Sequence, residues 1–275
     1  MPSEQMHYQW REPWNLQTPA IPITDKLSYV GNKDVSCHLL KTSVGAVLID
    51  TGFASTTYLL TESLHEAGAT PGDIALIIHT HGHVDHCGGT RRMKELSGAH
   101  VALGAADIDT VEKGTALTCA AYLYGIPHFE TFEVDEALED GDDVDCGDVV
   151  IQCHHTPGHT PGTMTFTFEL PVGSEKLTVG LMGGPGQWTL MDEHCAEQGY
   201  AGNREDFKRS LTYLTDLDVD VWLGAHPSQC DTVEKGERLA VQSAKGSAEP
   251  NPFIDPTGWK RFIENLKSEY EKRFE

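Results

Sequence analysis

Apolar and polar positions alternate with two different periodicities along this chain. Short apolar or alternating runs that stop at glycine, asparagine or aspartate are typical of strands, whereas apolar residues three and four apart predict helices. We expect strands over residues 26–30, 36–42, 45–50, 74–78, 99–103, 149–154, 163–168, 176–182 and 219–223. We expect helices over residues 56–67, 90–96, 105–113, 203–217 and 255–275. The pattern predicts two β-rich halves that both carry helices, in a single domain over residues 1–275.

The two ends of the chain differ in character. Residues 1–20 are polar and proline-rich, and we expect a surface arm that Trp10 and Trp14 pack onto the body. The last helix has one apolar face at helical spacing: Trp259, Phe262, Ile263, Leu266 and Tyr270. We expect this face to pack on the core, with a dimer interface as the alternative. Thr257 is the expected N-cap of this helix, and Asn203 that of the helix before it.

Composition and charge limit the classes of function. The 275 residues are 39% hydrophobic and 23% charged, which is ordinary for a globular protein, and the net charge is −22. Such a chain is a poor partner for nucleic acid, because phosphate binding needs clustered lysine and arginine. A membrane span needs about 18 apolar residues, and no apolar run approaches that length. We expect a small-molecule substrate, with neither a nucleic-acid nor a membrane partner.

The cysteines and the first residues of the chain bear on its compartment. Seven cysteines are scattered without a Cys-x-x-Cys pair, and most are expected to be small core residues. The first residues carry neither the basic region nor the apolar core of a signal peptide. These features predict reduced thiols in a cytoplasmic protein, or a periplasmic one if a leader has been removed.

Residues 130–148 form the strongest charge run and hold ten carboxylates. Their spacing does not fit a calcium-binding EF-hand loop, whose ligands alternate and end in glutamate. We therefore expect a solvated hairpin at a sheet edge.

The candidate chemistry is concentrated in the stretch Thr80-His81-Gly82-His83-Val84-Asp85-His86. It follows the predicted strand 74–78, so its four potential metal ligands lie on a loop just past a strand end. Two further predicted strands also end in loops that carry histidine, with His159 after strand 149–154 and His226 after strand 219–223. Loops at one edge of a sheet can converge, so we expect these residues to meet in one site.

The six potential ligands divide into two sets of three. His81, His83 and His159 would form one metal site, and Asp85, His86 and His226 would form another. Each set leaves a position open for water or substrate, which is typical of catalytic sites. Imidazole and carboxylate ligands without thiolate favour two zinc ions, with iron or manganese as alternatives. We expect His79 to pack or to support a ligand by hydrogen bonding, and Cys87 to be a small packed residue.

These motifs together resemble the metallo-β-lactamase superfamily. The matching stretches are residues 80–86, 156–162 and 224–226, with support from 48–52 and 139–142. The resemblance spans roughly residues 26–240 and implies an α+β fold, the four-layer αβ/βα sandwich, with two mixed sheets facing each other and helices outside. It also implies that Asp50, at the tip of a buried strand, steadies the histidine loop rather than binding metal.

One departure from the superfamily is informative. Many of its hydrolases, such as glyoxalase II and the quorum-quenching lactonases, carry a metal-bridging aspartate after the strand that follows the Pro-Gly-His loop. Here that stretch is Leu-Met-Gly-Gly-Pro-Gly, residues 181–186, and holds no carboxylate. In this respect, and in residues 224–229, the chain is similar to the third subclass of metallo-β-lactamases. The resemblance implies two metals that share a hydroxide but no protein carboxylate.

The predicted function is that of a dizinc hydrolase that uses a metal-bound hydroxide to cleave a cyclic amide of the β-lactam kind. Zinc lowers the pKa of bound water from about 15.7 to about 7, and Asp85 is the expected catalytic residue that orients the hydroxide. A lactone or thioester hydrolase is the first alternative, and an iron-dependent redox enzyme of the same fold is the second. Trp188, Tyr200, Ser228 and Gln229 are candidates for the pocket wall.

Overall fold

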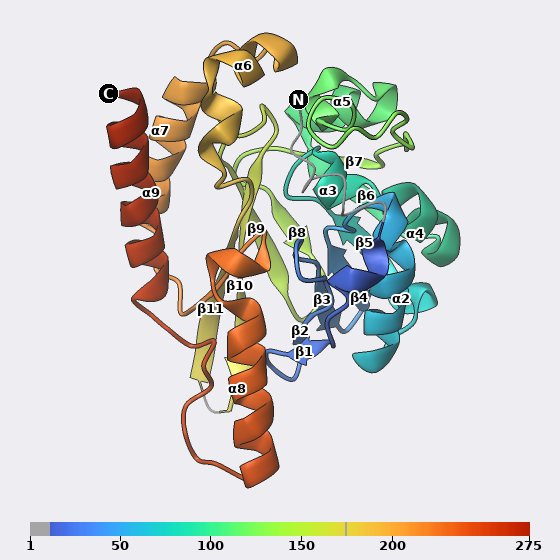
Figure 1. Cartoon of the computed structure of the whole chain (residues 1–275). Coiled ribbons are helices and arrows are strands. Elements are labelled where there is room, and N and C mark those ends of the chain that lie inside the picture. The colour runs from blue at the N-terminus through green and yellow to red at the C-terminus, as the bar shows by residue number, and fades with distance from the viewer. Residues whose placement is uncertain (1–11, 174) are drawn as a thin grey trace.

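The computed structural model describes residues 12–173 and 175–275, and their strands form two sheets (Figure 1). The first sheet has the order β1 (Ile21–Pro22), β2 (Leu27–Tyr29), β3 (His38–Thr42), β4 (Gly45–Ile49), β5 (Ile74–Ile78), β6 (His100–Gly104) and β7 (Glu136–Leu138). Its neighbours pair antiparallel from β1 to β4 and parallel from β4 to β7. The second has the order β12 (Val221–Leu223), β11 (Glu175–Met182), β10 (Met164–Val172), β9 (Val150–His155) and β8 (Asp143–Asp145). Both sheets are therefore mixed, since β11 and β12 are parallel and the other neighbours in the second sheet antiparallel.

Both faces of the first sheet are covered, which explains the uninterrupted apolar runs of its central strands. In β4, Val47 and Ile49 belong to a core between the two sheets that also contains Phe166 of β10. Leu48, which points the other way, belongs to a second core with Leu60. That second core lies beneath the helices α2 (Thr57–Glu66), α4 (Thr90–Ser97) and α5 (Ile108–Lys113).

A third core lies on the outer face of the second sheet. It joins Trp222 of β12 to α7 (Asn203–Leu214) and α9 (Gly258–Phe274). Figure 1 shows the two sheets between these helices on one side and α2, α4 and α5 on the other. The order helix, sheet, sheet, helix confirms the predicted α+β fold, the four-layer αβ/βα sandwich.

The predicted apolar face of α9 is confirmed as a core contact. Trp259, Ile263, Leu266 and Tyr270 are buried and belong to the third core, with Phe262 packed at its margin. Thr257 stands at the N-cap position, but its hydroxyl accepts no hydrogen bond from the helix backbone and donates to Asp255. Asn203 is not a cap, because α7 begins there and its amide donates to the Thr189 carbonyl.

The acidic run does not form the predicted hairpin. β7 pairs with β6 in the first sheet, whereas β8 pairs with β9 in the second, so the run crosses from one sheet to the other. Both strands do lie at a sheet edge, as predicted. Three-residue strands carry too little alternation to reveal which sheet they join.

Three helices were not predicted from the sequence, and the first is the short α3 (Val84–Cys87), which lies within the predicted ligand loop. α8 (Thr232–Lys245) buries only Thr232 and Gly236, and Leu239 is the one residue of this helix that packs, partly buried, against the core between the sheets. α6 (Asp192–Gln198) is short and buries only Gln198. No helix in the described ranges is long and apolar enough to cross a membrane.

The N-terminal arm is only partly within the described residues. A short 3-10 helix (Pro13–Leu16) buries Pro13 and Leu16, while Trp14 is 59% exposed. The prediction that Trp14 packs the arm onto the body is therefore wrong, and Trp10 lies outside the described residues. All seven cysteines are free thiols and six are buried, as predicted.

Candidate metal centre

The six predicted ligands are brought together by loops that follow β5, β9 and β12, and by the short helix α3 (Val84–Cys87). They form two groups, which we name by their members: the three-histidine group is His81, His83 and His159, and the Asp-His-His group is Asp85, His86 and His226. Within each group the three ligand atoms lie within 4.8 Å of one another. The sequence therefore identified residues that the fold places side by side, although they are up to 145 positions apart (226 − 81).

The three-histidine group is a buried cluster of nitrogen atoms. Nδ1 of His83 lies 3.2 Å from Nε2 of His81 and 3.0 Å from Nε2 of His159. Zn–N distances of 2.0–2.1 Å place tetrahedral nitrogen ligands roughly 3.3 Å apart, which is close to these separations. Burial lowers the pKa of all three imidazoles, that of His159 to about 4. The rings are therefore neutral at pH 7, which is the form that binds a metal.

The Asp-His-His group is more open and carries charge. Oδ2 of Asp85 lies 3.4 Å from Nε2 of His86 and 3.6 Å from Nε2 of His226, whose side chain is 31% exposed. Burial opposes a charge on His86, but the charge of Asp85 and hydrogen bonds to Asp50 and Asp85 raise its pKa to about 10. Oδ1 of Asp85 is buried without a hydrogen-bond partner. A buried acceptor without a partner is costly, so this carboxylate suits a cation or a water beside it.

The far nitrogens of four ligand rings are held by oxygen atoms. The distances are 2.9 Å from His81 Nδ1 to Thr80 Oγ1, 2.9 Å from His86 Nδ1 to Asp50 Oδ2, 2.8 Å from His159 Nδ1 to the Gly186 carbonyl, and 2.6 Å from His226 Nδ1 to the Asp34 carbonyl. Carboxylate and carbonyl oxygens only accept, and the Thr80 hydroxyl already donates to Asp50, so each Nδ1 must carry the proton. In the neutral ring that a metal requires, each Nε2 then turns a lone pair into its group, as in known metal sites. The residues present therefore fit a pair of metal ions.

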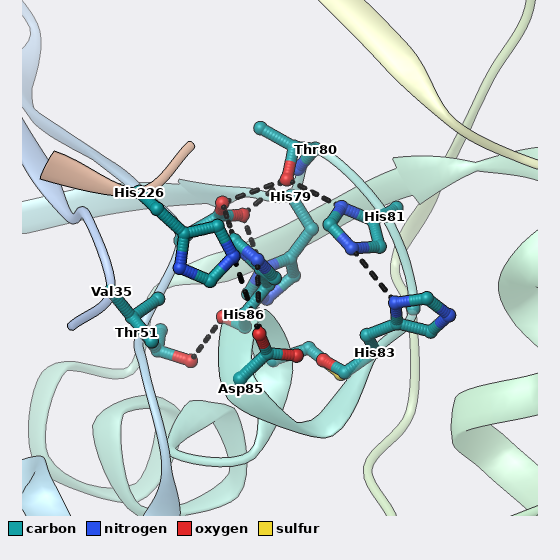
Figure 2. A network of polar contacts seen from close by, with 12 residues as sticks. Val35, Thr51, His79, Thr80, His81, His83, Asp85, His86 and His226 are labelled. Carbon is teal, nitrogen blue, oxygen red and sulfur yellow. Dashed lines mark hydrogen bonds and ion pairs between the residues drawn. The ribbon is translucent and has the colours of Figure 1, made fainter. Parts of the chain in front are cut away.

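Asp50 supports both groups from behind without belonging to either. Its carboxylate accepts hydrogen bonds from the Thr80 amide at 2.9 Å and the Thr80 hydroxyl at 2.7 Å, and it lies 3.3 Å from Nδ1 of His79. Nε2 of His79 in turn lies 2.8 Å from the Thr90 hydroxyl. Figure 2 shows His79 and His86 between His81 on one side and His226 on the other. The positions agree with the roles expected of Asp50 and His79.

The backbone of Asp50 has φ of 60°, a left-handed conformation that is uncommon for a residue with a side chain. Strain of this kind costs on the order of 1–3 kcal/mol and persists where the surrounding structure determines it. The hydrogen bonds of the Asp50 carboxylate to Thr80 and His86 provide that determination. Cys87 is buried and donates its thiol hydrogen to the His83 carbonyl, so the nearest cysteine packs away from the ligand atoms.

Both groups open into one cavity of about 520 Å³. Trp188, Ser228 and Gln229 line it, whereas Tyr200 is not among its lining residues and donates to Asp206 instead. The remaining lining side chains that bear on the chemistry are Leu123, Tyr124 and His194. No sequence pattern indicated these three residues, since they lie in an irregular segment and in α6, a helix that was not predicted.

Tyr124 reaches the Asp-His-His group directly. Its hydroxyl donates to Oδ2 of Asp85 at 3.0 Å, and its ring packs edge-on against Phe53 with centroids 5.0 Å apart. Trp188 covers the opposite wall, with its ring centroid 5.7 Å from that of His83 and 5.0 Å from that of His194. The cavity therefore presents aromatic walls around two metal-binding groups.

The turn after β11 leaves no room for a bridging carboxylate. Gly184 has φ of +60°, and a Cβ atom there would lie 2.4 Å from the His159 ring. A Cβ atom on Gly183 would lie 2.3 Å from the Met164 carbonyl oxygen. Within the described part of the chain, the two candidate groups accordingly share no ligand.

Comparisons with known proteins agree with this geometry. A model of the metallo-beta-lactamase superfamily matches residues 30–226. An uncharacterized protein of Aquifex aeolicus is 28% identical over 194 residues, which is 69% of this chain and 83% of that protein. A hydroxyacylglutathione hydrolase of Pseudomonas paraeruginosa is 39% identical over 90 residues, which is 33% of this chain and 26% of that protein. The structure of BJP-1, a subclass B3 metallo-beta-lactamase of Bradyrhizobium japonicum, superposes with a TM-score of 0.83 at 27% identity, covering 95% of this chain and 96% of that one. The predicted resemblance is confirmed, and the chain belongs to the metallo-β-lactamase superfamily.

Proposed function

We propose that this protein is a dizinc hydrolase that opens a cyclic amide of the β-lactam kind. The observation that carries the proposal is the pair of ligand groups, which share no carboxylate and open into the same cavity. The likeness to a subclass B3 metallo-β-lactamase over 95% of this chain supports the same reaction class.

The donor set supports zinc in particular. Five imidazoles and one carboxylate, without a thiolate, suit zinc better than the softer or harder metals. Bound zinc ions would supply a Lewis acid for the substrate carbonyl and would lower the pKa of a water molecule. The chain contributes the fixed tautomers, because Thr80, Asp50, Gly186 and Asp34 hold the far ring nitrogens.

Asp85 is the residue proposed to act on the attacking water. Its Oδ2 faces His86 and His226, while its Oδ1 is buried and has no hydrogen-bond partner. A free carboxylate oxygen in this position can accept a hydrogen bond from water and orient its lone pair toward the substrate. The Tyr124 hydroxyl, which donates to Oδ2, fixes the rotamer that makes this possible.

The cavity walls are suited to a compact, partly apolar substrate. Trp188 and Leu123 supply apolar surface, and the Ser228 hydroxyl and Gln229 amide supply polar groups at the rim. Burial lowers the pKa of His194, so this wall residue is neutral at pH 7. A wall of this kind binds by contact area and excludes bulk water from the reacting bond.

The proposal is tested by hydrolysis of a chromogenic cephalosporin with zinc-loaded protein. Turnover is expected, and it should disappear in a His81→Ala variant that is purified and loaded in the same way. No turnover above that of the variant would contradict the proposal.

A thioester hydrolase is the second candidate, because the local identity of 39% to a hydroxyacylglutathione hydrolase favours it. The lack of room for a bridging carboxylate at Gly183 and Gly184 weighs against it. Parallel assays with a glutathione thioester, an acyl-homoserine lactone and the cephalosporin separate thioester, lactone and cyclic amide. Metal analysis of the purified protein that found iron in place of zinc would favour a redox enzyme of the same fold.

A further inference from the structure

Asp107 is a buried carboxylate that the proposed reaction does not use. It ends the 3-10 helix Ala105–Asp107, which follows β6, and its side chain is fully buried. A carboxylate in such a place is costly unless its oxygen atoms are satisfied. Its partners are therefore informative.

All three of its hydrogen bonds go to the loops that carry the three-histidine group. Oδ2 accepts from the Gly82 amide at 2.8 Å and from the Thr160 hydroxyl at 2.6 Å. Oδ1 accepts from the Gly162 amide at 2.7 Å. Gly82 lies between His81 and His83, and Thr160 directly follows His159. One carboxylate thus joins the two loops that must meet for the three nitrogens to converge.

The glycines on both loops allow this close approach. A Cβ atom on Gly82 would lie 3.3 Å from Cβ and Oδ2 of Asp107. A Cβ atom on Gly162 would lie 2.5 Å from the Asp107 amide nitrogen and 2.7 Å from its Cγ. Gly104 packs closely against the Gly162 backbone, since a Cβ atom on Gly104 would lie 2.0 Å from the Gly162 carbonyl oxygen. Both loops therefore pack directly against Asp107, at distances that only glycine allows at residue 162.

The hydrogen-bond partners of Asp107 do not balance the charge of its carboxylate. Its three partners are uncharged donors, and burial raises its pKa while those hydrogen bonds oppose the rise. The three-histidine group contributes neutral imidazoles alone, so a divalent cation there would receive no negative charge from its own ligands. The Asp-His-His group, by contrast, contains Asp85 and is backed by Asp50.

We propose that Asp107 is a positioning residue that holds the His81–His83 loop and the His159 loop together and thereby sets the zinc affinity of the three-histidine group. This inference rests on the zinc binding of the proposed function, and it does not depend on the substrate. Residues that orient ligands from behind typically change metal affinity by about 10- to 100-fold when they are replaced.

The test measures zinc affinity site by site, with a chromophoric chelator as the competitor. His226→Ala leaves the three-histidine group intact, and His159→Ala leaves the Asp-His-His ligands intact. Asp107→Asn, which keeps the size of the side chain but loses acceptor capacity, is made in both backgrounds. We expect zinc affinity to fall about 10- to 100-fold in the His226→Ala background and to change less than threefold in the His159→Ala background.

A control variant, a pair of Thr160 variants and a folding check distinguish positioning from general damage to the fold. Asp135→Asn is the control, since Asp135 also accepts a backbone hydrogen bond, from Val101 at 2.8 Å, and its other side-chain partner is Lys94, which lies outside both ligand loops. Thr160→Val removes the hydroxyl that bonds Asp107, whereas Thr160→Ser keeps it, so the valine variant should bind zinc more weakly than the serine variant. Circular dichroism of the zinc-free proteins checks that each variant is folded.

The outcomes separate this inference from the proposed function. Equal zinc affinity in Asp107→Asn and its parent, or an equal loss in both backgrounds, would overturn the role of Asp107 while leaving the metal centre in place. If Asp107→Asn does not fold, equal affinities of the two Thr160 variants would overturn it. An unmutated protein that binds no zinc would overturn the proposed function, and this inference with it.

Discussion

The two ligand groups would hold a metal ion by different means. The three-histidine group is buried and neutral. The Thr80 hydroxyl holds Nδ1 of His81, and the Gly186 carbonyl holds Nδ1 of His159. Asp107 holds the loop of this group by accepting a hydrogen bond from the Gly82 amide. The Asp-His-His group carries its own carboxylate, is backed by Asp50, and reaches the surface through His226, whose side chain is 31% exposed. In the first group loop geometry should determine metal affinity, and in the second group charge should determine it.

Under the proposed function, this difference would give the two groups separate tasks within one cavity. The three-histidine group would leave the full charge of a bound cation available to polarise a carbonyl. The charged group holds a free carboxylate oxygen at Asp85, which can orient a proton-bearing water. The tasks can be tested separately, because the residues that support each group are largely distinct.

Replacing a ligand of the three-histidine group should have the largest effect on bound zinc and on hydrolysis. His159→Ala is expected to lower bound zinc from two ions to one per chain, because no charged ligand remains there to retain the ion. The Lewis acid is worth several kcal/mol, so hydrolysis should fall by about 10³-fold or more. Zinc analysis by mass spectrometry and initial rates check this. His65→Ala, at an exposed position on α2, is the control, and retention of two zinc ions by His159→Ala would contradict the two-group assignment.

Asp50→Asn should act mainly on the charged group. Asparagine tolerates the left-handed backbone at this position, so the change removes charge with little backbone strain. We expect a fall of about 10- to 100-fold in the zinc affinity of the Asp-His-His group, measured in the His159→Ala background. A smaller fall is expected in the three-histidine group, which Asp50 reaches only through Thr80. Equal losses at both groups would remove the distinction between them.

Tyr124→Phe should lower kcat/KM moderately, through the Asp-His-His group alone. The change removes one hydrogen bond to Asp85 and keeps the ring that packs against Phe53. A hydrogen bond to a charged group contributes about 1.5–3 kcal/mol, so we expect kcat/KM to fall at least tenfold. Zinc affinity in the His226→Ala background should be unchanged. Unaltered kinetics would show that the hydroxyl has no part in orienting Asp85.

Trp188→Leu should have the smallest effect and should not distinguish the two groups. The indole forms a wall of the cavity, and losing about 1 kcal/mol of substrate contact would raise KM about fivefold. The value of kcat should stay within twofold, since uniform binding affects KM alone. A large fall in kcat would mean that Trp188 acts on the reacting groups, which this account does not predict.

Sequence reasoning identified the parts of the molecule that local chemistry determines. The apolar runs of β4 and β5 predicted buried strands, and the ligand histidines could be grouped because each follows a strand end. The stretch 183–186 holds no carboxylate where related hydrolases carry one, and the resemblance therefore implied that no carboxylate bridges the metals. These features depend on neighbours within about ten residues, and so the sequence contains them.

The supporting residues depend on the fold and could not be identified in this way. Asp107 is 25 positions from Gly82 and 53 from Thr160, and only the meeting of both sheets brings the three together. His226 is anchored by a carbonyl 192 positions away at Asp34. Tyr124 lies in a segment without helical or strand periodicity, so nothing in its neighbours indicated a contact with Asp85. Long-range contacts of this kind leave no local pattern.

The most direct measurement is a crystal structure of the zinc-loaded protein with anomalous diffraction collected on both sides of the zinc absorption edge. We expect two zinc peaks per chain, one among His81, His83 and His159 and the other among Asp85, His86 and His226. We also expect that no protein carboxylate bridges them. A single shared peak, a zinc ion outside these groups, or an edge that identifies another metal would contradict the two-site assignment.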